Sequence, residues 1–145
     1  MGGGGGVRHR AGDVGVTRVS VVLCSFNGAG FVAGALESVY GQTTPLDQYE
    51  VVFIDDGSTD GTGQVASRFR RYPNFRYLRN RANRGLVASA NRGLREARGD
   101  LVIRLDDDDT FGPTILEEMR SVLEEGATDL VYSDRYDLLT RTGER

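Results

Sequence analysis

Several residue types are scarce or missing in this 145-residue chain, and each scarcity limits what the chain can do. It has no lysine and no tryptophan, and it has one cysteine and one histidine. The single cysteine, Cys24, excludes an intrachain disulfide and favours the cytosol, with contact at the inner face of the membrane left open. His9 lies in a glycine-rich segment, which argues against a histidine metal site or a Ser–His–Asp triad. No apolar run approaches the roughly 20 residues that span a bilayer.

The charge balance weighs against general nucleic-acid binding. The formal net charge is −3, whereas a nucleic-acid-binding domain presents a basic surface. The arginines nonetheless gather between Arg68 and Arg104, where they far outnumber the acids. This stretch could attract an anionic ligand, and a solvated surface of mixed charge explains it equally well.

Apolar strand patterns and helical patterns alternate from residue 18 onward. Residues 1–17 are glycine-rich and aperiodic, and we predict that they form a disordered tail. Runs rich in β-branched, apolar or aromatic residues predict strands at 18–26, 49–55, 74–80, 100–106 and 129–134. Apolar residues at helical spacing predict helices at 31–40, 65–72, 86–97 and 113–123, the first with Asn27 as its cap. This order predicts an α/β domain over 18–145, with a mainly parallel, doubly wound, Rossmann-like sheet and helices on both faces.

Polar clusters follow three of the predicted strands. They are the segments CSFNG after the first strand, DDGSTD after the second and DDDD after the fourth. Ligands of a doubly wound sheet bind beyond the carboxyl ends of its strands, where these clusters are expected to meet. We therefore favour one shared site over three unrelated solvated loops.

The four consecutive aspartates, Asp106 to Asp109, end an apolar run and repel one another, so they call for a cation. Since neither histidine nor cysteine is available, the ligands would all be oxygens, which favours Mg²⁺ or Mn²⁺ over Zn²⁺. Residues two apart on a strand point to the same side. Asp106 and Asp108 are thus predicted to bind the metal together, while Asp107 and Asp109 face elsewhere. A solvated acidic loop remains the alternative.

The residues present argue against three other kinds of ligand site: a calcium loop, a phosphate loop and a dinucleotide-binding site. Counted from Asp56, the segment DDGSTDGT resembles a calcium loop, but its twelfth position is Ser67 instead of glutamate. A phosphate loop needs a lysine that the chain lacks. No G-x-G-x-x-G segment follows the first strand, which weighs against a dinucleotide-binding oxidoreductase.

Together these segments resemble the inverting glycosyltransferases of family 2, which have the GT-A fold. Four segments match in order: VSVVLCSFNGAGFVAGALESVYGQT, EVVFIDDGSTDGT, NRGLVASANRGLREARGDLVIRLDDDD and the later YSD. The match covers about residues 18 to 137, and its ordered spacing is more specific than any one piece. The resemblance implies a nucleotide-sugar donor, most often a UDP-sugar, and a divalent metal that bridges its two phosphates.

The resemblance also implies roles for individual residues. The expected donor-binding residues lie in the first loop, after the second strand, around the third helix and in the acidic cluster: Ser25, Phe26, Asn27, Asp55, Asp56, Asn83, Gly85, Asn91 and Asp107. Asp106 and Asp108 match the metal-binding D-x-D. Position 90 is alanine where many relatives have an arginine that contacts the diphosphate, and Arg84 or Arg92 could replace it.

Length is the main departure from the family. We expect the acceptor half and the catalytic base beyond residue 145, so no base is assigned and this chain alone is expected to transfer little sugar. A sheet ending after the fifth strand would also leave apolar surface open to self-association. Two alternatives stay open: a module that binds a nucleotide-sugar without transferring it, and a sugar nucleotidyltransferase. The sugar, the nucleotide base and the acceptor are not predicted.

Overall fold

The computed structural model describes residues 18–125, and within them strands and helices alternate as expected. The predicted tail at 1–17 and the predicted strand at 129–134 lie outside the described residues. The elements are β1 (Val19–Ser25), α1 (Val32–Tyr40), η1 (Leu46–Gln48), β2 (Tyr49–Asp55), α2 (Thr62–Ser67), η2 (Arg68–Arg71), β3 (Phe75–Arg79), α3 (Leu86–Glu96), β4 (Leu101–Asp106) and α4 (Ile115–Glu124). None of these helices is long and apolar enough to cross a membrane.

The four strands form one parallel sheet in the order β3-β2-β1-β4, which confirms the predicted fold class. β1 lies in the middle of the sheet and is buried along its whole length. The register pairs Ser25 with Asp55 and Cys24 with Asp106, so β1, β2 and β4 end side by side. We call this the carboxyl end of the sheet.

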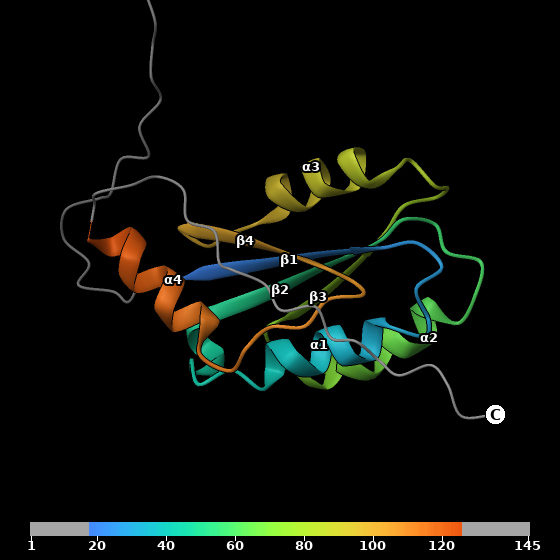
Figure 1. The fold of residues 1–145 in the computed structure, drawn as a ribbon. Helices are drawn as coiled ribbons and strands as arrows, with labels where there is room; N and C mark the ends of the chain where they lie inside the picture. Colours follow the sequence, from blue (N-terminus) through green and yellow to red (C-terminus); the bar gives the residue numbers. More distant parts are fainter. Residues whose placement is uncertain (1–17, 126–145) are drawn as a thin grey trace, which may run out of the picture.

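Helices cover both faces of the sheet, with α3 on one side and α1 and α2 on the other (Figure 1). The face toward α1 carries the larger core, in which Val21, Leu23 and Phe53 pack with Leu36 and Val39 of the helix. The face toward α3 carries a smaller cluster of Val22, Cys24, Val52 and Ile54. Because β1 and β2 bury both faces, their sequences are mostly apolar instead of strictly alternating. Cys24 is a core residue as expected, and burial raises the pKa of its thiol to about 11.

The predicted cap of α1 is wrong. Asn27 lies in the left-handed region, with φ of 53°, and the helix begins at Val32 after Phe31 without a side-chain cap. The chain first turns, since the N–H groups of Phe31 and Val32 both donate to the carbonyl of Gly28, at 2.9 and 3.0 Å. Phe31 is consequently 62% exposed and does not join the buried face of the helix.

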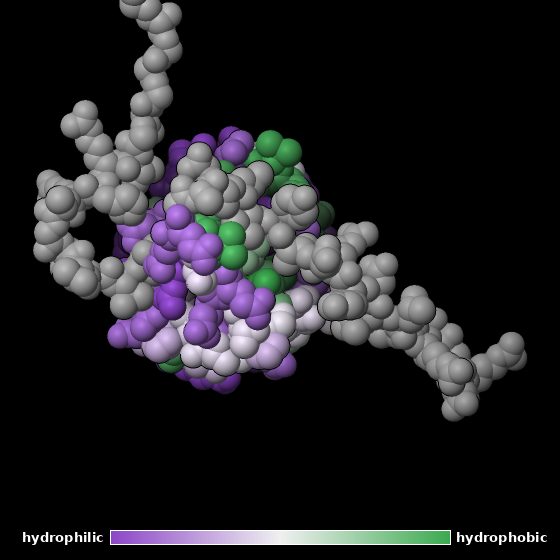
Figure 2. Space-filling model, turned by 60° about the vertical axis from the view of Figure 1, so that its left-hand side comes forward, coloured by the Kyte–Doolittle hydropathy of each residue, from purple (hydrophilic) through white to green (hydrophobic). Residues whose placement is uncertain are grey.

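The helix predicted at 86–97 is present as α3, but its large apolar residues do not face the sheet. Leu86, Val87 and Leu94 are 53%, 76% and 54% exposed, whereas Ser89 and Gly93 are buried. A Cβ atom on Gly93 would overlap with Cγ1 of Val22, so the helix lies unusually close to the sheet. The small residues therefore form the contact and the large ones turn outward. Figure 2 shows hydrophobic residues near the top of the molecule, the height at which α3 lies in Figure 1.

This close approach predicts opposite effects for alanine at two helical glycines. Gly93→Ala should destabilise the fold by about 1–3 kcal/mol, because the added methyl group overpacks against Val22. Gly34→Ala in α1 should stabilise it by about 0.5–1 kcal/mol, since nothing lies within 4 Å of the new Cβ. Urea unfolding of both variants measures the two effects. Equal stabilisation by both would mean that α3 does not pack this closely.

Candidate functional site

The polar clusters that follow β1, β2 and β4 meet at the carboxyl end of the sheet, as the sequence predicts. The loop after β1 is tied to the turn after β2, because Ser58 Oγ accepts a hydrogen bond from the N–H of Asn27 at 3.0 Å. Asn27 Oδ1 in turn accepts from the N–H of Thr59 at 2.9 Å. Asn27 thus connects two loops of the site, which replaces the capping role that its sequence position suggested. Its neighbour Phe26 is 46% exposed beside them.

A second tie joins the loop after β1 to the acidic cluster after β4. Ser25 Oγ donates a short hydrogen bond to the carboxylate of Asp107. That carboxylate lies against the backbone of Gly28, where a Cβ atom would overlap with it. Burial and the charges of Asp108 and Asp106 raise the pKa of Asp107, although the hydrogen bond from Ser25 opposes them. The first loop and the acidic cluster are therefore in direct contact at the carboxyl end of the sheet.

Asp55 is fully buried and supports the turn that follows β2. Its carboxylate accepts hydrogen bonds from the N–H of Ser58 at 2.8 Å and from Tyr77 Oη at 2.5 Å. It also pairs with Arg79 Nη1 at 3.2 Å. These partners lie within the protein and hold the turn in shape. The predicted contact of Asp55 with a donor stays a prediction.

Asp56 anchors the loop of residues 80–85 to the end of β2. Its carboxylate accepts from Asn80 Nδ2 at 2.7 Å and from the N–H groups of Arg84 and Gly85, both at 2.9 Å. Burial opposes its ionisation, but these hydrogen bonds outweigh burial and hold the pKa of Asp56 below its usual value. Gly57, with φ of 75°, lets the loop lie close, since a Cβ there would be 2.6 Å from the carbonyl carbon of Ala82. The carboxylate of Asp56, which was expected to bind the donor, is thus already engaged with this loop.

Asn80 extends the network toward α3 and was missed by sequence reasoning. Its Nδ2 also donates to Ser89 Oγ at 2.8 Å, and its Oδ1 accepts from Arg92 Nη1 at 2.6 Å. Arg92 Nη1 also donates to the carbonyl of Arg79 at 2.9 Å. Arg92 is therefore held below the loop instead of reaching freely into the site. An asparagine directly after the third strand was the available signal for Asn80.

The remaining residues predicted around α3 lie at the surface. Asn83 and Asn91 are exposed, and Asn83 Oδ1 accepts from the N–H of Gly85 at 2.9 Å. Gly85 has φ of 86°, which an L side chain rarely adopts, and it directly precedes α3. Its conformation lets the loop enter the helix while its N–H stays on Asp56.

The four aspartates form the end of β4 and the turn that follows it. The strand ends at Asp106, and the N–H of Asp109 donates to the carbonyl of Asp106 at 3.2 Å. Side chains alternate only along a strand, so the rule that pairs Asp106 with Asp108 loses its basis after Asp106. Asp107 points to Ser25, Asp106 pairs with Arg104, and Asp108 is exposed. Within residues 18–125, no three acidic, histidine or cysteine side chains are arranged to hold a metal.

The chemistry of the acidic cluster nevertheless fits a divalent cation. Carboxylate oxygens are the ligands that Mg²⁺ and Mn²⁺ prefer. The guanidinium of Arg104 lies at 2.5 and 3.2 Å from the two oxygens of Asp106, so a positive group already occupies one expected ligand. Burial is the main cause of the raised pKa of Asp107, and the charges of Asp108 and Asp106, which add to it, are ones that a bound cation would relieve. Binding by Asp106 and Asp108 stays a prediction.

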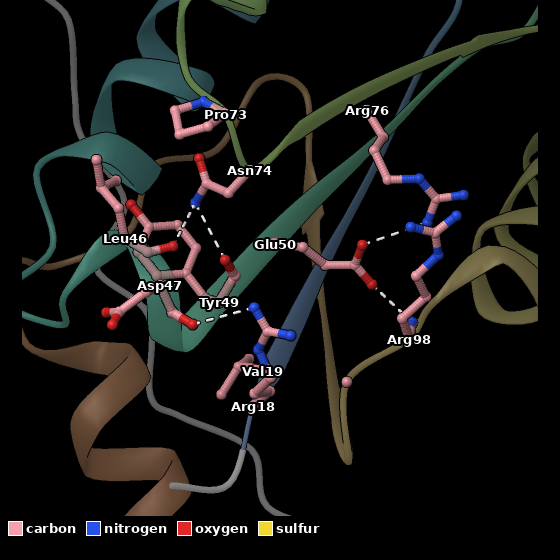
Figure 3. A pocket seen from close by; sticks show the side chains of 11 residues that line it. Arg18, Val19, Leu46, Asp47, Tyr49, Glu50, Pro73, Asn74, Arg76 and Arg98 are labelled. Carbon is pink, nitrogen blue, oxygen red and sulfur yellow. Dashed lines mark hydrogen bonds and ion pairs between the residues drawn. The ribbon is translucent and has the colours of Figure 1, made fainter. Parts of the chain in front are cut away.

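A separate hollow of about 420 Å³ lies at the opposite, amino end of the sheet (Figure 3). Its polar groups bind one another. Glu50 accepts from Ser20 Oγ at 2.7 Å, from the N–H of Arg98 at 2.6 Å and from Arg76 Nη1 at 3.2 Å. Arg18 Nη2 donates to the carbonyl of Asp47 at 3.2 Å. These contacts join β1, β2, β3 and the segment before β4, so we assign this hollow a role in stability.

Glu50→Gln is expected to destabilise the protein by about 1–2 kcal/mol at neutral pH, because hydrogen bonds to the charged carboxylate are lost. Burial raises the pKa of Glu50, but the three hydrogen bonds outweigh burial and hold it below its ordinary value of 4.5. A depressed pKa contributes stability that is present above 4.5 and is lost as the pH falls through the folded-state pKa. The difference between wild type and variant should therefore shrink on acidification, as urea unfolding at several pH values measures. A difference independent of pH would contradict this origin.

Comparison with known sequences assigns most of the chain to one protein family. The model of the family described as glycosyl transferase family 2 matches residues 20–144. The chain is 35% identical over 119 residues to a cholesterol galactosyltransferase of Borreliella burgdorferi, covering 82% of this chain and 33% of that protein. It is 33% identical over 114 residues to the glycosyltransferase AglE of Haloferax volcanii, covering 78% of this chain and 38% of that protein. The chain thus spans about a third of the length of these relatives.

Solved structures agree with the fold described above. The structure of Staphylococcus aureus TarS 1–349 in complex with UDP-GlcNAc superposes with a TM-score of 0.71 at 28% identity, over 74% of this chain and 31% of that chain. A Pyrobaculum calidifontis mannosyltransferase in complex with GDP-Man and Mn²⁺ gives 0.68 at 27% identity, over 80% of this chain and 34% of that one. With the strand order, the meeting loops and the family match in agreement, the chain belongs to glycosyl transferase family 2 and has its GT-A fold.

Proposed function

We propose that this chain carries the donor-binding site of an inverting glycosyltransferase that uses a nucleoside-diphosphate sugar and Mg²⁺ or Mn²⁺. The observation that carries the proposal is the gathering of four polar segments at the carboxyl end of the sheet. Asn27 ties the first loop to the turn after β2, Ser25 ties it to the acidic cluster, and Asp56 ties that turn to the loop before α3. This arrangement suits a ligand with a polar nucleoside and a strongly anionic diphosphate.

Each segment has a proposed role. The first loop, with Ser25, Phe26 and Asn27, contacts the nucleoside, and the half-exposed ring of Phe26 offers a surface on which a base can stack. The turn after β2 and the loop with Asn83 and Gly85 contact the base and the ribose. Asp106 and Asp108 hold the metal, with Asp107 beside them.

The proposed reaction is a single displacement at the anomeric carbon. An acceptor hydroxyl forms the new C–O bond as the bond to the diphosphate breaks, and the nucleoside diphosphate leaves with the bonding electron pair. The proton of the hydroxyl passes to a general base, for which we assign no residue. A bound divalent cation would stabilise the negative charge that grows on the leaving phosphate. The protein's own contribution is to hold the nucleoside and to align the diphosphate.

A uracil base is the proposed choice. The TarS structure was solved with UDP and with UDP-GlcNAc, which supports UDP, whereas the mannosyltransferase was solved with GDP-Man. Because relatives of similar likeness differ in the base, the choice must be measured on this chain. We propose that this chain can also contact a membrane surface peripherally and can associate with itself. These two properties and the class of acceptor must likewise be measured on this chain.

Titration calorimetry of the 145-residue chain tests the proposal. We expect UDP to bind in the presence of Mn²⁺ more tightly than without it, and more tightly than GDP. UMP, which lacks the second phosphate, should show little response to Mn²⁺. Absence of UDP and GDP binding under both conditions would reject the donor site. Release of UDP from a UDP-sugar, with and without candidate acceptors, then separates transfer from binding alone.

A further inference from the structure

Arg104 places its positively charged guanidinium beside the acidic cluster, a contact that no sequence pattern predicted. It lies on β4 two residues before Asp106, and its register partner on β1 is Val22. Partners in a parallel sheet point to the same face, so Arg104 extends on the face that α3 covers. There Ala90 of α3 packs against the cluster that contains Val22 and Cys24. The side chain of Arg104 is 46% exposed, so it lies at the open border of this face.

The guanidinium of Arg104 binds both oxygens of Asp106. Nη1 lies 2.5 Å from Oδ1 and Nη2 lies 3.2 Å from Oδ2. This bidentate contact engages both carboxylate oxygens of Asp106. A proposed metal ligand is thus already paired with the guanidinium of Arg104. Both partners are partly exposed, with 46% and 40% of their side chains accessible. Exposed ion pairs stabilise proteins only weakly, so a divalent cation can displace this arginine.

A displaced Arg104 would be free to bind phosphate. Its planar guanidinium matches a phosphate group as well as it matches a carboxylate. Arg92 is less suited to this role, since Asn80 and the carbonyl of Arg79 hold it below the loop. Arg84 lies at the surface on the loop that Asp56 anchors, on the far side of β1 from β4. Arg104 is the arginine that already contacts the acidic cluster.

We propose that Arg104 is a donor-binding residue that exchanges partners during donor binding. Before a divalent cation binds, Arg104 neutralises Asp106, and when the cation takes the carboxylate, Arg104 turns to the diphosphate of the donor. The proposal rests on the proposed function for the identity of the anion. The exchange keeps the charge of Asp106 compensated in both states. It also makes the metal and the diphosphate cooperate, because the metal releases the group that binds the phosphate.

The test compares Arg104→Ala with the wild-type chain in two binding measurements. Mn²⁺ alone, followed by electron paramagnetic resonance, should bind up to about fivefold more tightly to the variant, because no arginine competes for Asp106. UDP at saturating Mn²⁺, followed by calorimetry, should bind about tenfold or more weakly, because the phosphate loses its guanidinium. Uridine, which has no phosphate, should bind equally to both proteins. Arg95→Ala, which removes an exposed charge from the last turn of α3, is the matched control and should change neither affinity.

The opposite signs of the two effects make the outcomes decisive. Unchanged or weaker Mn²⁺ binding by Arg104→Ala would overturn the competition at Asp106. Unchanged UDP affinity would overturn the phosphate contact. If wild type binds no nucleotide, the proposed function and the phosphate contact both fail, while the Mn²⁺ measurement still decides the competition. Matching urea transitions for the variant and the wild type exclude a folding defect as the cause.

Discussion

Alanine at Asp106 or at Asp108 is expected to abolish the Mn²⁺-dependent part of UDP binding while the fold survives. Residues that merely support metal ligands contribute about 10–100-fold to metal affinity, so removing a ligand should cost at least that much. Asp106→Ala has a second consequence, since Arg104 would lose its partner and leave an uncompensated positive charge beside the cation. Calorimetric titration of UDP with and without Mn²⁺ measures the loss.

Asp109→Ala is the matched control for these two variants. It removes the same charge from the same turn, and Asp109 is exposed. Its backbone N–H, which donates to the carbonyl of Asp106, is kept. We expect this variant to retain most of the Mn²⁺ effect. Equal responses to Mn²⁺ in wild type and in both the Asp106 and Asp108 variants would return the cluster to a solvated acidic loop.

Asp56→Ala should weaken UDP binding by about 1–3 kcal/mol even without metal, typical of a lost hydrogen bond to a charged group. It should also destabilise the fold by about 2–4 kcal/mol, because Asn80 and the N–H groups of Arg84 and Gly85 lose their acceptor. The second effect follows from the structure, in which the buried carboxylate holds the loop of residues 80–85. Urea unfolding and calorimetry on the same samples measure both effects.

The pattern over several nucleotides decides how Asp56 acts. A loss confined to UDP indicates a direct contact with the base, whereas an equal loss for UDP, GDP and CDP indicates that the loop has moved. Asn80→Ala separates the two further, because it leaves the carboxylate of Asp56 in place and removes one of its donors. If only the loop matters, this variant should reproduce part of the loss for every nucleotide. Full affinity in Asp56→Ala would exclude both roles.

The fold class could be predicted from the sequence because it depends on local patterns. β1 and β2 are mostly apolar since they bury both faces, and helical spacing marks the segments between strands. Parallel strands place their carboxyl ends together, so the meeting of the clusters after β1, β2 and β4 followed from their order alone. The family could also be predicted, because its motifs stand in order along the chain.

Local patterns failed where a contact between distant segments decided the outcome. The apolar residues at helical spacing located α3 but not its buried side, because the close approach of Gly93 to Val22 favours small residues at the contact. Asn27 was read as a helix cap, whereas its partners Ser58 and Thr59 lie on another loop. Helical spacing carries no information about how near a helix comes to a sheet.

The candidate site divides in the same way. Sequence by itself determined which residues reach the carboxyl end of the sheet, because strand order and motif position suffice for that. Only the tertiary structure decided what each side chain does there: Asp55 supports a turn, Asp56 anchors a loop, and Asp106 pairs with Arg104. The reason is physical, since a carboxylate takes its partners from whichever donors and charges the packed chain brings within about 3 Å. Those donors come from segments up to 82 residues apart, as in the contact between Ser25 and Asp107.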